Sequence, residues 1–199
     1  MIGRAPRWLF VGVLLSAALI HCGKKSDAGV ASGNDAGTPV DLDVMAFLSE
    51  ARALHHETNV HEDSGDVKAA IASLDRLVHA KRPREGTKVP EVEEVLADTY
   101  ARLADLRLRS GDVDGASREV REGMTHAPDM TYFRGHLLEV DGIVEEARGA
   151  NLADAGKRDE AQKARAHAIE RLREAVDVQE RVVTTSLASQ DAGKHEGTK

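Results

Sequence analysis

Residues 89–128 read VPEVEEVLADTYARLADLRLRSGDVDGASREVREGMTHAP and hold the clearest structural pattern in the chain. Pro90 suits the first turn of a helix, where its missing N–H has no helical partner to lose. Apolar side chains then recur at helical spacing, at Val92, Leu96, Leu103 and Leu106. Gly111 can end that helix in a left-handed turn, and Asp112 can cap the next one. A second apolar stripe follows at Val113, Ala116, Val120 and Met124. The stretch therefore predicts two helices joined by a tight turn.

The same kind of turn occurs three times along the chain. Gly65, Gly111 and Gly156 lie 46 and 45 residues apart, each between two stretches with helical apolar periodicity. A self-similar period of this length is typical of helical repeat arrays. No stretch combines strict alternation with β-branched and aromatic residues, so we predict no β-strand. The predicted fold class is therefore all-α.

The segment 89–128 resembles a tetratricopeptide repeat. In that motif an aromatic, a large apolar and a small residue line the first helix, and Tyr100, Leu103 and Ala104 stand at these positions. The turn glycine, the small residue of the second helix and the closing proline also match, at Gly111, Ala116 and Pro128.

The neighbouring units match that motif only in part. The second unit agrees at Gly65 and Ala70, and the third at Gly156 and Ala161. The spacing exceeds the usual length of about 34 residues for this family, and we expect long first helices to absorb the excess. The resemblance implies three stacked helical hairpins in a TPR-like α-solenoid, with a concave groove. A six-helix bundle remains the alternative.

The N-terminus has the pattern of a secretory signal. Arg4 and Arg7 precede an uncharged run over residues 8–20, and Cys22 follows it. This arrangement resembles the lipobox of bacterial lipoproteins, although His21 stands where that family usually has a small residue. Cleavage after residues 16–18 without lipidation is the alternative. An uncleaved anchor is disfavoured, because the run is shorter than the about 20 residues needed to span a bilayer.

The lipoprotein resemblance implies a signal peptide over residues 1–21 and a covalent lipid on Cys22. It also implies the outer membrane, because Gly23 rather than Asp follows the cysteine. Residues 22–37 are rich in Gly, Ser and Lys and are predicted to be a flexible tether. A helical domain is predicted over 38–188, with Thr38 capping its first helix and Asp41 answering in a capping box, and a disordered tail over 189–199.

Composition excludes several kinds of ligand. Without residues 1–21 the chain carries 25 basic and 34 acidic side chains, a net charge of −9. Such a chain repels phosphate backbones, so we expect no nucleic-acid partner. Only one cysteine is present in the whole sequence, which rules out an internal disulfide.

Candidate catalytic and metal-binding residues are few. His55, His56 and His61 gather near the end of the first predicted helix and are the only candidates we weigh for a metal. They are not three or four residues apart, so they do not share one helical face, and the expected role is a solvated helix end. The sequence has no nucleophile elbow, phosphate loop or zinc-protease motif. We therefore predict no enzymatic activity and no cofactor other than the lipid on Cys22.

These observations favour a scaffold that binds an envelope protein or peptide in the concave groove. The polar residues expected to face the groove are Asp98, Arg102, Arg107, Glu139 and Glu146. Two alternatives remain: a periplasmic lipoprotein that binds a small ligand or metal through residues 55–63, and a purely structural spacer.

Overall fold

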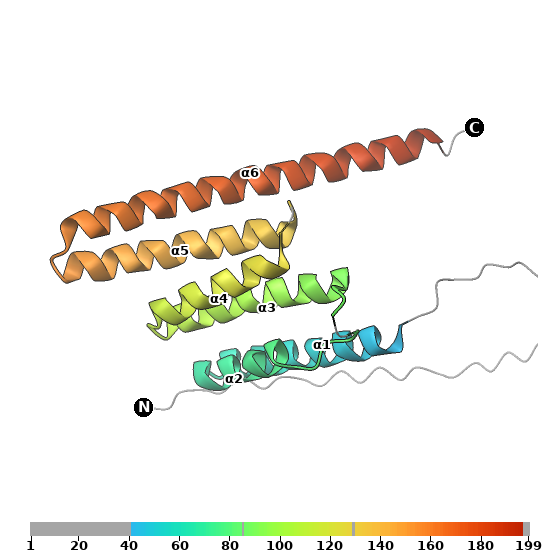
Figure 1. Ribbon diagram of the computed structural model, residues 1–199, viewed down its shortest axis with the longest axis horizontal. Coiled ribbons are helices and arrows are strands. Elements are labelled where there is room, and N and C mark those ends of the chain that lie inside the picture. The colour runs from blue at the N-terminus through green and yellow to red at the C-terminus, as the bar shows by residue number, and fades with distance from the viewer. Residues whose placement is uncertain (1–40, 85, 129, 197–199) are drawn as a thin grey trace, which may run out of the picture. The chain divides into compact units, whose positions relative to one another are not determined.

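A computed structural model describes residues 41–84, 86–128 and 130–196, with side chains described as far as residue 189. Six α-helices cover most of this part of the chain (Figure 1): α1 (Leu42–Asp63), α2 (Val67–Val78), α3 (Pro90–Arg109), α4 (Val113–His126), α5 (Tyr132–Asp154) and α6 (Arg158–Glu196). No strand occurs in the described ranges, which confirms the all-α prediction. The predicted signal peptide 1–21, Cys22, the tether 22–37 and Thr38 lie outside these ranges. None of the described helices is long and apolar enough to cross a bilayer.

The three predicted glycine turns share one hydrogen-bonded geometry. Gly65, Gly111 and Gly156 have φ values of +77°, +85° and +76°. At the first turn, the N–H of Gly65 donates to the carbonyl oxygen of Glu62, and the N–H of Asp66 to that of His61. The other two turns repeat these bonds at equivalent positions, which makes each a Schellman motif. The left-handed turns predicted from the glycines are therefore confirmed.

Two helix boundaries differ from the prediction. The first helix begins at Leu42, and Asp41 is itself the N-cap, its carboxylate accepting from the N–H groups of Asp43 and Val44. The prediction of a capping box with Asp41 inside the first turn was therefore wrong. Asp41 takes the cap because its side chain reaches the exposed N–H groups directly. At the other end, α6 continues to Glu196, beyond residue 188 where we expected the helical domain to stop.

Consecutive helices pack in pairs: α1 with α2, α3 with α4, and α5 with α6. Contacts also join the pairs, since α3 touches α1, α2 and α5, and α5 touches α4. Among the described helices α6 contacts α5 alone, and Figure 1 shows it as the outermost helix, on the side of α5 away from α3. Much of the surface of α6 is therefore left uncovered by this part of the chain.

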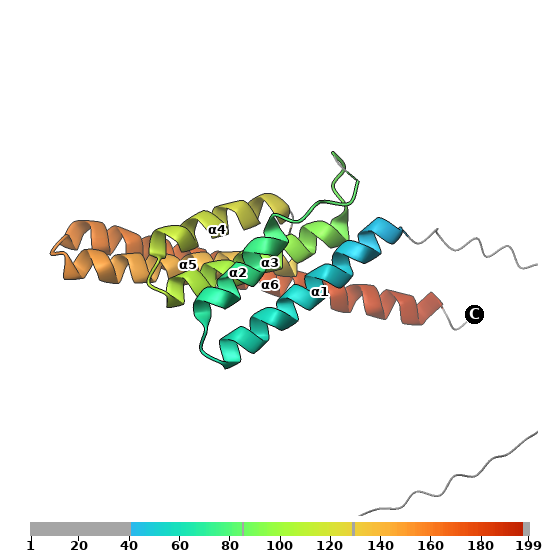
Figure 2. The ribbon, with the colours of Figure 1, turned by 90° about the horizontal axis from the view of Figure 1, so that it is seen from below.

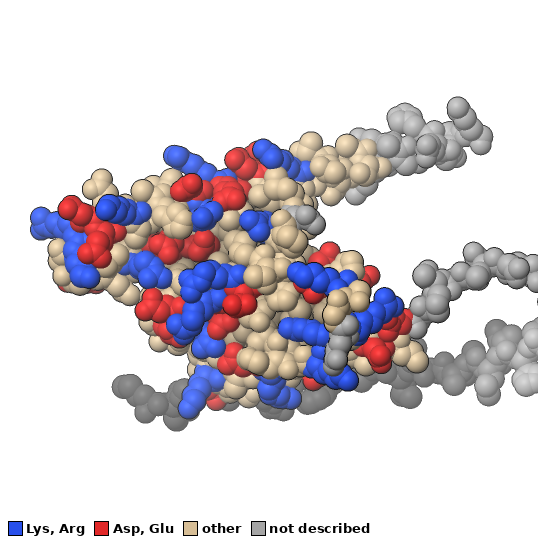
Figure 3. Space-filling view, in the orientation of Figure 1, with Lys and Arg blue, Asp and Glu red and all other residues tan. Residues whose placement is uncertain are grey.

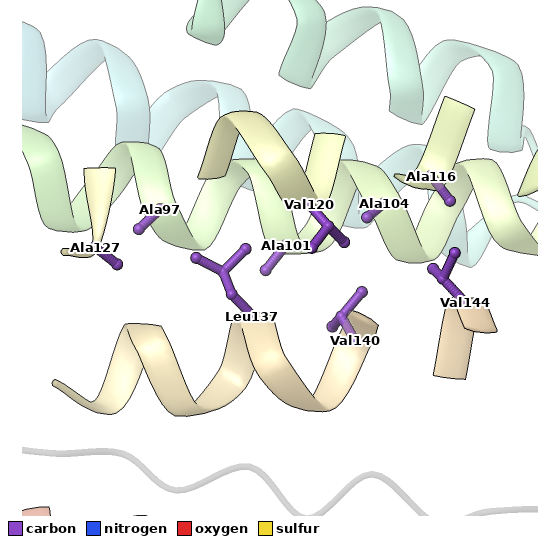
Figure 4. Close-up of a cluster of buried hydrophobic side chains, with 9 residues drawn as sticks. All are labelled: Ala97, Ala101, Ala104, Ala116, Val120, Ala127, Leu137, Val140 and Val144. Atoms are coloured by element: carbon purple, nitrogen blue, oxygen red, sulfur yellow. The ribbon is translucent and has the colours of Figure 1, made fainter. Parts of the chain in front are cut away.

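The core between the second and third helix pairs is built from small side chains. Figure 4 shows three alanines of α3 facing side chains of α4 and α5. The buried cluster consists of Ala97, Ala101, Ala104, Ala116, Val120, Ala127, Leu137, Val140 and Val144. Small residues on α3 let the neighbouring helix axes approach closely, so that Leu137 of α5 packs against both α3 and α4. A separate cluster around Phe47, Leu54 and Leu96 joins α1 to α2 and α3.

A seam of glycine and alanine joins α5 to α6. Gly135, Gly142 and Gly149 recur every seven residues on α5 and are buried. A β-carbon at these positions would lie 3.6, 3.2 and 3.3 Å from three carbonyl oxygens of α6, those of Ala175, Ala168 and Ala161 respectively. The two seven-residue repeats run in opposite directions and pair along the helices. Because the three glycines have no side chain, the backbone of α5 can lie directly against α6 at these points.

Candidate binding groove between α1 and α3

An open groove of about 590 Å³ lies between α1 and α3, and Phe133 of α5 contributes to its wall. Spacings of three and four residues bring the lining side chains onto one face of each helix. The α1 wall consists of Leu48, Ala51, Arg52, His55, His56 and Asn59. The α3 wall consists of Glu91, Glu94, Val95 and Asp98.

The two walls of the groove differ in charge. Three carboxylates line the α3 side, at Glu91, Glu94 and Asp98, and none of them forms an ion pair within 4.0 Å with another described residue. The α1 side carries the guanidinium of Arg52 and two imidazoles. Apolar surface from Leu48, Val95 and Phe133 lies between these charges. The groove thus offers both unpaired carboxylates and apolar contact area.

His55 is held in place by side chains of α3. Its Nε2 lies 3.0 Å from the hydroxyl oxygen of Thr99, whose own O–H donates to the carbonyl oxygen of Val95 at 2.6 Å. Its Nδ1 lies 3.3 Å from a guanidinium nitrogen of Arg102. These partners fit a neutral ring that donates from Nε2 and accepts at Nδ1. Burial lowers the pKa of His55; Arg102 acts in the same direction and Asp98 opposes it.

An arginine and carboxylate network joins α1 to α3 next to Asn59, a lining residue of the groove. Arg102 donates to the amide oxygen of Asn59 and to the carboxylate of Glu62, and Arg109 donates to the other oxygen of Glu62 at 2.6 Å. Burial raises the pKa of Glu62, but hydrogen bonds and charge from Arg102 and Arg109 outweigh it, so the pKa lies below its ordinary value. The network ties α1 to α3 and fixes the orientation of Arg102.

The three histidines weighed for a metal do not converge in the structure. His55 has the protein partners described above, His56 is exposed, and His61 faces Glu57 across 3.9 Å. Within the described ranges no group of three or more His, Cys, Asp or Glu side chains has the arrangement of a metal site. The C-terminal half of α1 is therefore a polar surface on which the three imidazoles have different surroundings and do not meet at one point.

The residues expected to face the groove are only partly brought together. Asp98 lines it and Arg102 borders it through His55. Glu139 and Glu146 of α5 are exposed and are not among the lining residues. The prediction for Arg107 was wrong, because this side chain instead bonds to Asp75 of α2 and Glu119 of α4. Periodicity placed Arg107 on α3 but did not reveal which neighbour each face meets.

Several groove residues were missed by the sequence analysis. Arg52 and Leu48 lie on α1, Glu91 and Glu94 on α3, and Phe133 comes from a helix far along the chain. The spacing of Glu91, Glu94 and Asp98 was a usable signal, since these residues share one helical face. Nothing local indicated that this face meets the one bearing His55.

The positions that carry the tetratricopeptide resemblance have structural roles. Leu103, Ala104, Ala70, Ala116 and Ala161 are buried, and Tyr100 is half-buried with its ring stacked on His126 at 5.5 Å. Pro128 is exposed after the end of α4. The buried positions and Tyr100 contribute to contacts between helices, and none of these residues, Pro128 included, lines the groove.

No protein-family model matches the sequence, and no curated protein matches it significantly.

Proposed function

We propose that this chain is a lipid-anchored envelope protein whose helical domain is a non-enzymatic, TPR-like scaffold for binding other proteins. The groove between α1 and α3 carries this proposal. Both walls belong to the first helix of a pair, and in a stack of helical hairpins the first helices line the concave side. The repeated Schellman turns and the α1–α3–α5 contacts support such a stack.

The chemistry of the groove favours an extended peptide segment with a basic residue next to an apolar one. Glu91, Glu94 and Asp98 present negative charge that no described residue neutralises through an ion pair. A Lys or Arg of the partner can supply that charge, and its apolar neighbour can cover Val95 and Phe133. An acidic partner would place like charges opposite one another, which disfavours binding.

A peptide titration tests the groove. Fluorescent peptides of about ten residues, carrying Lys or Arg beside Leu or Phe, are titrated with the full chain, and matched peptides carry Glu in place of the basic residue. We expect the basic peptides to bind and the affinity to fall with salt. The double variant Glu94→Gln, Asp98→Asn should weaken binding about tenfold, which is about 1.4 kcal/mol. Glu122→Gln, an exposed site on α4, is the matched control.

Two results would contradict the groove assignment. One is equal affinity for the basic and acidic peptides. The other is a loss of affinity in the Glu122→Gln control as large as in the groove variant. Circular dichroism of each variant separates altered binding from altered folding.

The anchor is proposed from the lipobox resemblance at Cys22 and is tested separately. Mass spectrometry of the mature N-terminus should find Cys22 as the first residue, carrying acyl chains. Each buried methylene of such chains adds about 0.8 kcal/mol to membrane binding. Cys22→Ser should therefore move the protein from the membrane to the soluble fraction. A mature chain that starts before Cys22, with a free thiol, would contradict the anchor and leave the groove proposal standing.

A further inference from the structure

Helix α6 exposes a row of apolar side chains that this part of the chain does not cover. Ile169, Val176 and Val183 are 52%, 53% and 57% exposed, and Leu187 is 57% exposed. The first three recur every seven residues, so they form one stripe along the helix. Single exposed apolar residues are ordinary, but a periodic stripe on one helix is typical of a helix–helix interface.

The position of Ile169 in the repeat shows what kind of surface this is. Val78, Met124 and Ile169 stand at the same distance after the turn glycines Gly65, Gly111 and Gly156. Val78 is buried in a cluster with Leu103 and Leu106 of α3, and Met124 packs against clusters that include residues of α5. Each of these side chains thus meets the following helix pair. Ile169 has the same register but no following pair among the described helices.

The far end of α6 has the character of an interface as well. At 39 residues α6 spans about 58 Å, against about 35 Å for the 23 residues of α5. The end of α6 extends past α5 in both ribbon views (Figures 1 and 2). Residues 182–189 carry no charge, and Figure 3 shows this stretch as an uncharged surface next to the mixed charges of the preceding turns. A terminal repeat normally presents a polar outer face, whereas α6 carries this apolar stripe among its exposed charged residues.

We propose that a second copy of this chain covers the α6 stripe, with the two α6 helices antiparallel and the two-fold axis beside Val176. Ile169 and Val183 lie equally far from Val176 along the helix, so each meets the other in the partner copy. Arg173 and Glu180 flank the centre, are exposed, and form no ion pair with another described residue. In the antiparallel arrangement Arg173 of one copy faces Glu180 of the other.

Charge selects the antiparallel arrangement over the parallel one. In a parallel pair Arg173 would face Arg173 and Glu180 would face Glu180, and like charges at such positions disfavour a helix pair. An antiparallel pair is isologous: both copies use the same surface, and the assembly stops at a dimer instead of growing into a filament.

Disulfide cross-linking tests the geometry directly. The full chain, purified in mild detergent, is oxidised as the variants Val176→Cys, Val183→Cys, and a mixture of Ile169→Cys with Val183→Cys. Val176→Cys should give at least ten times more covalent dimer than Glu122→Cys, an exposed control on α4. Val183→Cys alone should stay at the control level, and its mixture with Ile169→Cys should cross-link. The unsubstituted chain gives the background from Cys22.

Sedimentation measures the association without an introduced thiol. The unsubstituted chain should sediment as two copies and Val176→Glu as one, with the helical content measured by circular dichroism unchanged. Lys163→Glu, at an exposed site on α6 that is not on the face bearing the stripe, should leave the dimer intact. A monomeric unsubstituted chain would overturn the proposal. So would efficient self-linking of Val183→Cys, which indicates a parallel pair, or a dimer that survives Val176→Glu.

Discussion

Gly142 of α5 lies directly against Leu172 of α6. A β-carbon at Gly142 would come within 2.6 Å of the Cγ of Leu172 and 3.2 Å of the carbonyl oxygen of Ala168. The contact sits at the middle of three glycines on α5 that lie against α6. The separation of the two helices is therefore set by a residue with no side chain.

Replacing this glycine should destabilise the protein although alanine favours helix. Gly142→Ala gains about 1 kcal/mol in helix propensity, but overpacking costs about 1–3 kcal/mol and the facing carbonyl oxygen cannot rotate away. We expect a net loss of about 1 kcal/mol in the free energy of unfolding, measured by urea denaturation. Glu146→Ala, exposed on the same helix, is the control and should change stability by less than about 0.5 kcal/mol. A Gly142→Ala protein as stable as the parent would contradict the close packing.

Gly111 should be sensitive for a different reason. Its φ is +85°, and nothing lies within 4 Å of the place a β-carbon would occupy, so any loss comes from the backbone alone. Gly111→Ala should lower the free energy of unfolding by about 1–2 kcal/mol. Gly111→Asn should lower the free energy of unfolding clearly less than Gly111→Ala does, because Asn tolerates the left-handed region better. Equal losses for Ala and Asn in the same urea series would argue against this conformation.

Arg102 should contribute more to stability than an exposed arginine does. Its side chain is 24% exposed, and it bonds to Asn59 and Glu62 across the α1–α3 contact. Arg102→Met should cost about 1–2 kcal/mol, since it removes hydrogen bonds to a partly buried carboxylate. Arg118→Met, at an exposed site on α4, is the control. A double-mutant cycle with Glu62→Gln should give a coupling energy of at least about 0.5 kcal/mol; additive effects would mean that the pair contributes nothing.

His55 should make stability depend on pH. Burial lowers the pKa of the folded imidazole below the unfolded value of about 6.5. The unfolded chain then binds the proton more readily than the folded chain. The contribution of His55 to the free energy of unfolding is therefore fully present above a pH of about 6.5 and is lost as the pH falls through the folded pKa. Thermal unfolding should therefore show a larger decrease in Tm between pH 7 and pH 5 for the parent than for His55→Gln. His56→Gln, at an exposed neighbouring position, should show the same decrease in Tm between pH 7 and pH 5 as the parent.

The helices and turns were predictable from local pattern. Apolar spacing located the six helices, and Gly65, Gly111 and Gly156 marked turns whose positive φ values the structure confirms. These features depend on residues close together in sequence, because a helix bonds each N–H four residues back and a Schellman turn closes within six. The cap at Asp41 was misplaced by the same local reasoning, since Thr38 and Asp41 are both good capping residues.

The partners of each helix face required the folded chain. Arg107 was expected in the groove and instead meets α2 and α4, whereas Glu91 and Glu94 line the groove and were missed. The seven-residue glycine repeat of α5 was present in the sequence, yet its meaning depends on the alanines of α6 that face it.

The order of helices, the turns between them and the acidic balance of the chain can thus be read from residues near one another, because short-range hydrogen bonds and periodicity set them. The groove between α1 and α3, the contacts of His55 with Thr99 and Arg102, and the uncovered stripe of α6 arise only when distant segments pack. Periodicity identifies the apolar face of a helix, but which other helix covers that face is set by side-chain shape and charge at contacts far apart in sequence.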